Sequence, residues 1–480
     1  MACELAGARL LMPVFGMSIE VWAAVIATTL GVLSVGYWLG GRIADRYPNE
    51  TPPALALVLA GMSLLLMSSC GPTIVGLFSG FSFMAGIWSA AAAMLSAPFL
   101  LLGMIQPLLV RLLITDARRT GRTVGGLLAT STIGGVSGTI ATGLILLPDL
   151  GVSKTLLILA VGSTGLGVMV WVACRRWKAA CCTLAAVAAA GVAGWRLELP
   201  RQADGPMRVI ERAEGLYGFL EVLEYHGGRA LVCNGVFQAA LPLSTADVQP
   251  GLLIRGRDYT ELVPYLRPAA RAALVIGLGG GLHARMLSLY GFDVQAVEIE
   301  PAVVRLAEKH FGVYADVTIA DGRAFLARTS RRFDAVVLDT FLGGTPPEHL
   351  YTREAFERIG EVLEPDGVLA IHLIGRPGHP ATLAVIRTLQ AVFAHTLGAR
   401  SGFDDELQHL YLFASRSELS LAGEKGVALA DFGFSGTDLF EPNAGNGILL
   451  TDDRTCLALL GRDLVVEHQQ HSLQVRRRSW

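Results

Sequence analysis

Three carboxylates, each placed at the end of an apolar run, are the side chains of this sequence best suited to chemistry. Glu298 ends the run VQAVE, Asp321 follows DVTIA, and Asp339 ends FDAVVLD. Helical segments separate these runs, which predicts parallel strands joined by helices. Because the carboxyl ends of parallel strands lie at the same edge of a sheet, we expect the three carboxylates to line one ligand site.

A glycine-rich segment comes before these carboxylates. The apolar run AALVI leads into Gly277, Gly279 and Gly281, whose missing side chains let a nucleoside approach the backbone. Glu298 lies 21 residues after Gly277, where a carboxylate can accept hydrogen bonds from both ribose hydroxyls. Leu282 stands where a dinucleotide-binding motif has its last glycine, which disfavours a dinucleotide as the ligand.

The other two carboxylates extend this nucleoside site. Asp321, with Gly322 after it, follows the third predicted strand, where its carboxylate can reach an adenine amino group. Asp339 ends the fourth strand and is expected to face the reactive end of the ligand. The pattern therefore predicts an adenosyl nucleoside laid across the first three strands, and a donor of the S-adenosylmethionine type fits it best.

The surrounding segments predict two further domains in the second half of the chain. Residues 204–257 alternate in MRVIERAEGLYGFLEVLEY and GRALVCNGVFQAALPL, which indicates a small antiparallel β-sheet domain. Residues 258–465 alternate the strands AALVI, VQAVEIE, DVTI, FDAVVLD and VLAIHLIG with the helices HARMLSLY, AVVRLAEKHF and TREAFERIGEVLEPDG. This alternation predicts a Rossmann-like α/β domain of the methyltransferase type, and residues 466–480 form a basic tail.

The first 200 residues have another composition and predict another solvent. They hold 19 of the 80 charged side chains, and residues 51–110 hold none. Because a bilayer demands such stretches and water does not favour them, we predict a multi-pass α-helical membrane domain over residues 1–200, with about six helices. The segments are 19–40, 54–70, 87–114, 124–147, 155–174 and the shorter, alanine-rich 179–195. Small residues are dense in 125–143, which predicts close contact between helices there.

The Lys and Arg residues between these segments predict the orientation of the membrane domain. Arg42 and Arg46, the cluster at 111–122 and the cluster at 175–178 all fit a cytoplasmic position. A segment 179–195 that spans the bilayer places the rest of the chain outside, whereas a segment that lies in the interface keeps it inside. We expect the second half on the cytoplasmic face of the cell membrane, because adenosyl donors are made in the cytosol.

Several classes of function and site have no support in the sequence. Neither half carries a long basic stripe, so no nucleic-acid partner is expected. The ten histidines show no metal-ligand spacing, and the seven cysteines form no CxxC motif, so no metal site is expected. The lipid bilayer and a small molecule are the expected partners, and a homo-oligomer is left open.

Residues 208–373 resemble the spermidine synthase, or polyamine aminopropyltransferase, family. The resemblance rests on NGVFQ, on Tyr259 and Glu261 in a Tyr-x-Glu motif, on the glycine segment, and on VEIE, ADGRAF, VVLDTF and HLYTREAF. The first 200 residues resemble the membrane-fused members of this family in RLLMPVFGMSIEVWAAVIATTLG and GGLLATSTIGGVSGTIATG.

This resemblance implies an activity and a donor. The donor is decarboxylated S-adenosylmethionine, or S-adenosylmethionine itself as a co-substrate, bound through the glycine segment, Glu298 and Asp321. Asp339 takes the position of the general base that removes a proton from an amine nucleophile. An alkylammonium is no nucleophile until it loses a proton, so a carboxylate beside it suits this role.

The resemblance also implies a site for a small amine such as putrescine. Tyr259, Glu261 and Gln238 are the residues expected to bind this substrate. His349 lies near Asp339 in the sequence and is a further candidate for the acceptor pocket, or a histidine that packs a loop.

The sequence departs from the family pattern at positions that hold cationic substrates. Soluble members have an aspartate in the glycine segment where this chain has Gly280, and a second one where it has Leu342. Other departures are Gly218 after Tyr217, Thr260, and Asn234 in the Asn-Gly pair. A site with fewer carboxylates should bind a polycation less well.

Three hypotheses about function therefore remain open. The first is an aminopropyltransferase of the spermidine synthase type, the second a methyltransferase or other alkyl transferase that uses intact S-adenosylmethionine. The third is a membrane protein of the transporter or scaffold type whose nucleoside domain only senses. The nucleoside that leaves distinguishes the first two, and the third releases none.

Overall fold

The computed structural model describes residues 1–15, 19–78, 81, 83–114, 120–183, 207–225, 227–242, 249–313, 315–341, 346–402, 407–421, 434, 438–461, 463–468 and 471–472. The chain divides into two compact units. The first consists of Met1–Gln202 with Glu214–Phe219, and the second of Ala203–Ala213 with Leu220–Trp480.

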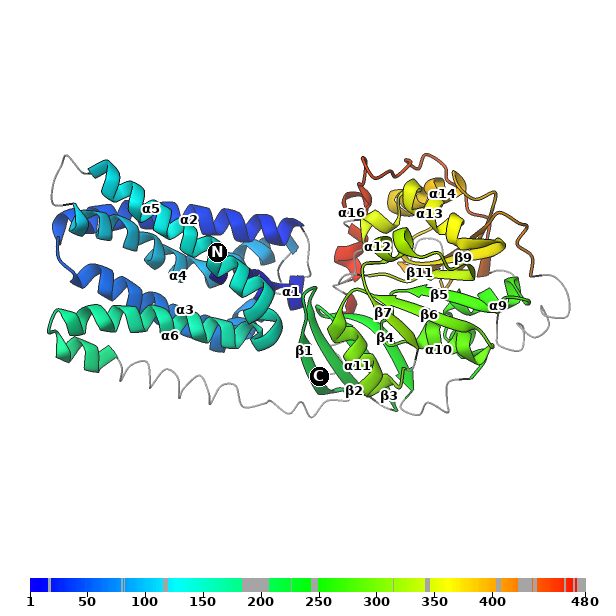
Figure 1. The fold of residues 1–480 in the computed structure, drawn as a ribbon, viewed down its shortest axis with the longest axis horizontal. Helices are drawn as coiled ribbons and strands as arrows, with labels where there is room; N and C mark the ends of the chain where they lie inside the picture. The colour runs from blue at the N-terminus through cyan, green and yellow to red at the C-terminus, as the bar shows by residue number, and fades with distance from the viewer. Residues whose placement is uncertain are drawn as a thin grey trace. The chain divides into compact units, whose positions relative to one another are not determined.

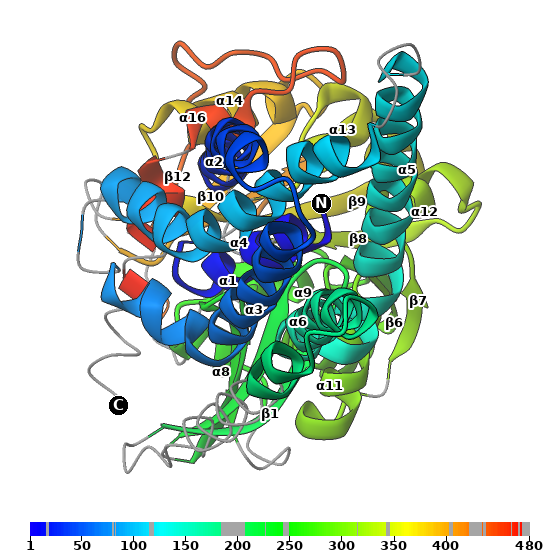
Figure 2. The ribbon, with the colours of Figure 1, turned by 90° about the vertical axis from the view of Figure 1, so that its left-hand side faces the viewer.

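Helices build the first unit (Figure 2). They are α1 (Ala2–Phe15), α2 (Ile19–Arg46), α3 (Thr51–Leu77), α4 (Phe83–Leu113), α5 (Thr120–Ala141), the π-helix η2 (Thr142–Leu146) and α6 (Leu147–Ala173). The helix α2 packs along α4, and α3 packs along both α4 and α6. Gly36 permits the close approach of α2, since a Cβ there would lie 2.5 Å from the carbonyl oxygen of Leu100 in α4.

Five of these helices are long and apolar enough to cross a membrane, judged by length and composition. They are Glu20–Arg46, Thr51–Leu77, Met84–Leu113, Thr120–Leu146 and Asp149–Ala173. They coincide with five of the six segments that hydropathy predicts. Most of the sixth segment, 179–195, lies outside the described residues. The helix α1 is a further element that the sequence analysis did not anticipate.

The glycine-rich segment 125–143 does not pack as predicted. No side chain of α5 is buried, and a Cβ added at Gly126, Gly134 or Gly138 would meet nothing within 4 Å. The hydroxyls of Thr130 and Thr139 donate to carbonyl oxygens of their own helix, so they need no partner from a neighbouring helix. The prediction of close helix contact is therefore wrong for this segment within the described chain.

A four-stranded sheet precedes the nucleoside-binding motifs. Its strands β1 (Met207–Glu214), β2 (Phe219–Tyr225), β3 (Gly228–Cys233) and β4 (Val236–Pro242) lie in that order. Asn234 and Gly235, with φ of 49° and 83°, form a two-residue turn between β3 and β4, a geometry that Asn-Gly pairs favour. The ladder then shifts register between Leu231 and Val232, which leaves Gln238 as the extra residue of a β-bulge.

The second sheet has eight strands in the order β12-β10-β11-β9-β8-β5-β6-β7. The bounds are β5 (Ala272–Ile276), β6 (Asp293–Glu298), β7 (Asp316–Ile319), β8 (Phe333–Leu338), β9 (Leu363–Gly375), β10 (His395–Arg400), β11 (Gln408–Ser415) and β12 (Leu439–Phe440). The run from β7 to β9 is parallel, and β11, β10 and β12 join it in antiparallel fashion. This arrangement confirms the predicted Rossmann-like fold of the methyltransferase type. The strand order reverses between β5 and β8, which is where such sheets bind ligands.

Helices cover both faces of this sheet (Figure 1). They are α10 (Leu282–Leu289) and α11 (Pro301–Phe311) on one face, and α12 (Gly322–Arg328), α13 (Arg353–Val362) and α14 (Pro380–Gln390) on the other. Short helices complete the unit: α8 (Leu252–Arg255), η4 (Tyr259–Leu262), α9 (Val263–Leu266), η5 (Glu348–Leu350) and α16 (Leu457–Leu460). Alternate residues of β5 enter opposite cores, Ala273 and Val275 with α10 and α11, Leu274 and Ile276 with α12 to α14.

The fifth predicted strand is longer than expected. The sequence analysis extended the helix TREAFERIGEVL through Pro365 and Gly367, but α13 ends at Val362 and β9 begins at Leu363. Leu363 already has extended backbone angles, with φ −77° and ψ 146°. The residues EPDG therefore belong to the strand, which runs for 13 residues.

Gly277 is the residue on which the approach of β5 to β8 depends. Its φ is +94°, and a Cβ there would lie 1.9 Å from the carbonyl oxygen of Asp339. Gly279 also has a positive φ, +51°, but a Cβ there would meet nothing within 4 Å. A side chain at Gly277 would therefore meet both backbone strain and a steric conflict, whereas a side chain at Gly279 would meet backbone strain alone.

We expect Gly277→Ala to destabilise the second unit far more than Gly279→Ala. Strain alone should cost Gly279→Ala about 1 kcal/mol of unfolding free energy. Gly277→Ala adds displacement of the Asp339 backbone and should cost about 3 kcal/mol or more. Calorimetry of the detergent-solubilised protein measures both, and equal losses in the two variants would contradict the steric argument.

Candidate active site

The glycine segment and Asp339 meet where β5 and β8 end. The amide of Asp339 donates to the carbonyl oxygen of Ile276 at 3.0 Å, and the amide of Gly277 donates to that of Val297 at 2.9 Å. The segment then turns into α10 at Gly281, whose φ is +75°. The backbone therefore fixes the first residue after β8 beside the glycines at the point where the strand order reverses.

Glu298 lies at the end of β6, close to the same loop. Its Oε2 accepts from the amide of Leu278 at 3.0 Å, and its Oε1 accepts from the amide of Glu300 at 2.9 Å. Burial raises the pKa of Glu298, while these backbone donors act in the opposite direction. The carboxylate is thus held rigidly against the glycine segment, with lone pairs left over for hydroxyl donors of a ligand.

Asp321 lies between β7 and α12 and forms the N-cap of that helix. Its Oδ1 accepts from the amide of Ala324 at 2.9 Å, and its Oδ2 lies 2.8 Å from Nε2 of His349. Burial opposes ionisation, but the Ala324 amide and His349 outweigh it and lower the pKa of Asp321. Gly322 has no room for a side chain, because a Cβ would lie 2.6 Å from Ile276.

The structure therefore places two predicted residues together that the sequence analysis assigned to different subsites. His349, a candidate for the acceptor pocket, contacts the carboxylate expected at the adenine. It also lines a polar cavity of about 440 Å³ with Arg323, Glu348 and Asp452. Its role in binding the acceptor stays a prediction.

Asp339 is held between two histidines. Its Oδ1 lies 2.8 Å from Nδ1 of His372 in β9, and its Oδ2 lies 3.1 Å from Nδ1 of His283 in α10. On its other side, Nε2 of His283 lies 2.8 Å from Oδ2 of Asp258. His283 thus bridges two carboxylates, and about a fifth of the Asp339 side chain remains exposed.

The hydrogen bonds continue beyond His372 to the neighbouring strand. Nε2 of His372 lies 2.8 Å from Nδ1 of His409 in β11. The His372 ring lies nearly parallel to the rings of His409 and Tyr411, whose centroids are 5.1 Å and 5.0 Å away. Tyr411 in turn forms a hydrogen bond with Asp258. Five titratable side chains, which we call the Asp-His cluster, therefore form one chain: Asp258, His283, Asp339, His372 and His409.

Charges in this cluster stabilise one another. Burial opposes ionisation of Asp339, but His372 and His283 outweigh it and hold its pKa well below the usual range. At Asp258, burial would raise the pKa, but the charge of His283 outweighs this effect and lowers the pKa to about 2. For His283, the two carboxylates outweigh burial and raise the pKa well above its usual value. His283 is therefore an imidazolium between two carboxylates at neutral pH.

Two other predicted substrate residues are engaged in the protein itself. Glu261 is buried, and its Oε2 accepts from the amides of Leu253 and Ile254 at 2.9 and 3.1 Å. Its Oε1 accepts from the amide of Gly251 and from the Tyr290 hydroxyl. Glu261 thus holds the start of α8, and its part in substrate binding stays a prediction.

Tyr259 is buried as well, with 1% of its surface exposed. Its ring packs edge to face against Tyr411 and Phe434, and it forms a hydrogen bond with Asp438. Gln238, in contrast, is half-buried at the bulge of β4, next to Ala239, which contacts the glycine segment. A bulge can aim a side chain out of the ladder, which suits a ligand contact at Gln238.

Gly280 lacks room for any side chain. A Cβ there would lie 2.8 Å from both Cβ of Ala239 and Cδ1 of Leu241. The position at which soluble family members carry an aspartate is therefore closed by an apolar contact with β4. An aspartate at this position would require β4 to move.

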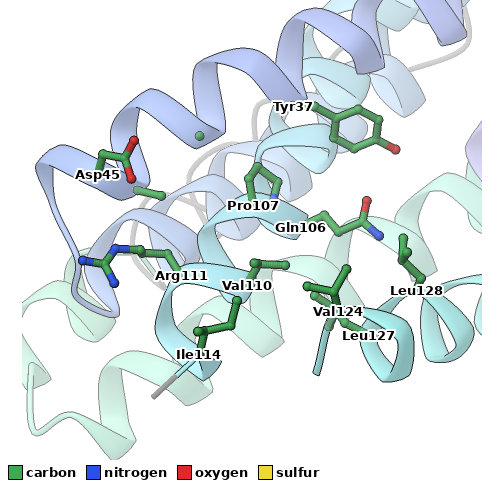
Figure 3. A pocket seen from close by; sticks show the side chains of 12 residues that line it. Tyr37, Asp45, Gln106, Pro107, Val110, Arg111, Ile114, Val124, Leu127 and Leu128 are labelled. Atoms are coloured by element: carbon green, nitrogen blue, oxygen red, sulfur yellow. The ribbon is translucent and has the colours of Figure 1, made fainter. Parts of the chain in front are cut away.

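A separate cavity lies in the helical unit, between α2, α4 and α5 (Figure 3). It has a volume of about 470 Å³, and Tyr37, Asp45, Gln106 and Arg111 provide polar groups in a largely apolar lining. No residue that the sequence analysis assigned to the nucleoside or amine site lines this cavity. Within the described ranges, no three His, Cys, Asp or Glu side chains are grouped to hold a metal ion.

Comparison with known proteins identifies the family of the chain. Residues 257–374 match the sequence model of the spermine/spermidine synthase domain. A protein named polyamine aminopropyltransferase 2, from Hyperthermus butylicus, is 30% identical over 224 residues, which cover 42% of this chain and 70% of that protein. The chain belongs to the spermine/spermidine synthase family. This is a family of transferases.

This spermine/spermidine synthase family member is also similar to other proteins. An N-terminal histidine N-methyltransferase from Emericella nidulans is 36% identical over 132 residues, 26% of this chain and 24% of that protein. A solved structure of a probable spermidine synthase from Corynebacterium glutamicum has 17% identity and a TM-score of 0.43, over 51% of this chain and 97% of that one. The chain spans between 24% and 59% of the lengths of the first three curated relatives.

Sequence reasoning about this family member missed most of the Asp-His cluster. It did not single out Asp258, His372 or His409. His372 was visible in the predicted strand VLAIHLIG, where a histidine interrupts an apolar run. A polar residue in a buried strand needs a partner, and that signal could have pointed to Asp339.

We expect the bridge formed by His283 to stabilise this synthase-family domain in a limited pH window. Because the pKa of His283 is raised in the folded state, its contribution to the free energy of unfolding is fully present below about pH 6.5. This contribution is lost as the pH rises through the folded-state pKa. Because the pKa values of Asp258 and Asp339 are lowered in the folded state, their contribution to the free energy of unfolding is fully present above about pH 4. This contribution is lost as the pH falls further. The window therefore runs from about pH 4 to 6.5.

The variant His283→Gln tests this window. It should lose about 2 kcal/mol of unfolding free energy at pH 5.5, and the difference from the parent should shrink toward pH 9. Calorimetry across this pH range measures it. His395→Gln, at an exposed position of β10, is the control and should follow the parent. A constant difference between His283→Gln and the parent at every pH would contradict the charge assignment.

Proposed function

We propose that the protein is a membrane-bound transferase that moves an aminopropyl group from decarboxylated S-adenosylmethionine to a small amine such as putrescine. The observation that carries this proposal is the position of Asp339. It follows β8 at the point where the strand order reverses, beside the glycine segment, in a chain of the spermine/spermidine synthase family.

The chemistry of this transfer assigns a task to each part of the site. Glu298 and Asp321 bind the ribose hydroxyls and the adenine amino group, and the glycine segment admits the nucleoside to the backbone. Asp339 accepts a proton from the acceptor ammonium, and the freed nitrogen attacks the methylene carbon next to the sulfonium. A C–N bond forms, the C–S bond breaks, and the electron pair stays on sulfur, which leaves as the neutral thioether of methylthioadenosine.

The ionised state of Asp339 supports this assignment. A carboxylate that accepts a proton must be charged beforehand, and the two histidines hold its pKa well below the usual range. Its remaining exposure leaves a route for a cationic amine. Alignment of nitrogen, carbon and sulfur then supplies much of the rate enhancement, because the donor carries its own leaving group.

The helical unit supports a location at the membrane. Five helices have the length and apolar composition of membrane spans, and the clusters of Arg and Lys between them favour a cytoplasmic position for those loops. We propose that the transferase domain lies on the cytoplasmic face, where adenosyl donors are made.

A second candidate is methyl transfer from intact S-adenosylmethionine. It is favoured by Gly280, where the contact with Ala239 and Leu241 leaves no space for a carboxylate that would hold an aminopropyl ammonium. Absence of that carboxylate also removes a repulsion against the carboxylate of intact S-adenosylmethionine. The similarity to an N-methyltransferase points in the same direction.

The released nucleoside decides between the two reactions. We expect the detergent-purified protein to form methylthioadenosine from decarboxylated S-adenosylmethionine only when an amine is present, as measured by mass spectrometry. Formation of adenosylhomocysteine from S-adenosylmethionine would instead establish methyl transfer. Tight binding of both donors without any product would reject both reactions and favour a sensing role.

The variant Asp339→Asn tests the assigned base. Turnover should fall at least about 100-fold, the usual contribution of a general base, while the dissociation constant for the nucleoside stays within about twofold of the parent. Asp316→Asn, at the exposed start of β7 and far along the strand from the site edge, is the control and should retain full turnover. Loss of nucleoside binding in Asp339→Asn would show that this residue binds the donor and is not the base.

A further inference from the structure

The Asp-His cluster connects a partly buried carboxylate to the protein surface. Asp339, His372 and His409 are linked by two contacts of 2.8 Å, and His409 lies at an exposed position of β11 while the His372 side chain is only 11% exposed. The strands set this order, because β9 and β11 are antiparallel neighbours with Tyr411 opposite His372. His409 is two residues from Tyr411, so it lies on the same face of the sheet.

Both ring nitrogens of His372 are engaged, which limits its protonation states. An ionised carboxylate can only accept, so Nδ1 of His372 donates to Asp339. Its Nε2 then has two options toward Nδ1 of His409. In the first, His372 is an imidazolium and Nε2 donates to a neutral His409. In the second, His372 is neutral and Nε2 accepts from the Nδ1 proton of His409.

These two states differ by one proton, which is released to or taken up from solvent at His409. When the Nε2 proton of His372 moves to Nδ1 of His409, the Nε2 proton of His409 passes to a solvent base. His372 becomes neutral and still donates to Asp339 from Nδ1. The cluster loses one positive charge without a water molecule at the buried contact, and the reverse steps restore it.

The surroundings of His409 disfavour its protonated form, so that it can pass a proton on without retaining it. Burial against its neighbours and the charge of His372 lower the pKa of His409 to about 4, and His468 acts in the same direction. Asp258 and Asp339 partly oppose this effect. His409 is therefore neutral at pH 7, and a neutral imidazole can donate from one nitrogen and accept at the other.

We propose that His372 and His409 form a proton-exchange path between Asp339 and the surface, and that this path sets the charge beside the carboxylate that deprotonates the amine. With His372 charged, two imidazolium groups neutralise Asp339, and the carboxylate is a poor base. With His372 neutral, only His283 remains charged, and it is shared with Asp258. The carboxylate then gains basicity and accepts the proton of the ammonium.

A purely structural role does not explain why His409 is present. Packing and orientation of Asp339 require only His283 and His372, whose rings are largely enclosed. His409 adds a ring at an exposed position of β11, and its contact to His372 uses a nitrogen that can exchange a proton. His372 and His409 are positioning residues by this account, since neither needs to touch the amine.

The path rests on the proposed transfer reaction and is tested by variants at its outer end. In His409→Ala, kcat should fall at least tenfold at pH 7, with KM for amine and donor within twofold of the parent. Imidazole added at constant pH and ionic strength should restore kcat in proportion to its concentration, because it replaces the missing ring as a proton carrier. His395→Ala, which removes an exposed histidine from β10, should show neither effect.

A second variant guards against loss of structure. His409→Gln retains hydrogen-bonding groups but cannot exchange a proton, so it should be as slow as His409→Ala at an unchanged melting temperature. Turnover of His409→Gln within twofold of the parent, or a defect of His409→Ala that imidazole does not relieve, would overturn the path.

Failure of the proposed reaction is distinguishable from failure of the path. If the parent releases no nucleoside from either donor, the transfer proposal fails, and nitrogen-15 NMR of labelled histidine still reports on the path. His372 should then lose its proton over the same pH range as His409 exchanges tautomer, and His409→Gln should shift that titration. Independent titration of His372, unaffected by His409→Gln, would reject the path alone.

Discussion

The negative charge of Asp339 is the constraint around which the second unit of this protein is arranged. A partly enclosed carboxylate stays ionised only if nearby groups compensate for the water it has lost. Two histidines, one in α10 and one in β9, supply that compensation, and a glycine at the end of β5 lets the backbone approach. Gly277 lets the backbone of β5 lie against Asp339, α10 brings His283 to one oxygen, and β9 brings His372 to the other. Because β8 lies between β5 and β9 in the sheet, Asp339 at its end can contact all three elements at once.

One departure from the family pattern, Gly280, has a steric explanation in this arrangement. A carboxylate in the glycine segment is excluded at Gly280 by Ala239 and Leu241, so that region offers no anion for a cationic substrate. The anions of the site are instead Asp258 and Asp339, and a charged histidine lies between them. Asp258 and Asp339 thus form one coupled group with His283, and the net charge of that group is small. Coupled groups titrate together, so the proton affinity of Asp339 belongs to the whole cluster.

Much of this could be predicted from the sequence, because the signals were local. Strand ends after apolar runs fixed Glu298, Asp321 and Asp339 at one edge of the sheet, and residues 51–110, free of charge, predicted helices of membrane-spanning length. What could not be predicted depended on register between distant strands. His409 meets His372 because β11 pairs antiparallel with β9, and neither β10, β11 nor β12 was anticipated.

Contacts outside the local sequence also determine the surroundings of Glu261 and of the small residues in α5. Glu261 carries a family motif, yet its oxygens are occupied by the amides at the start of α8 and by Tyr290. Small residues in α5 suggested a packed helix, but small side chains only permit close approach and do not enforce it. In both cases the sequence shows the residue type, but the contacts that the residue makes depend on segments elsewhere in the chain.

In the proposed reaction, the cluster also connects binding of the amine to proton transfer. With His283 charged and His372 neutral, Asp258 and Asp339 leave the cluster with a net charge of about −1. With His372 also charged, the net charge is zero. A cationic amine is attracted only to the first state, which is also the state in which Asp339 is the better base. The same proton that leaves through His409 therefore prepares the site to attract the ammonium and to deprotonate it, whereas a fixed carboxylate would provide attraction and basicity without this link.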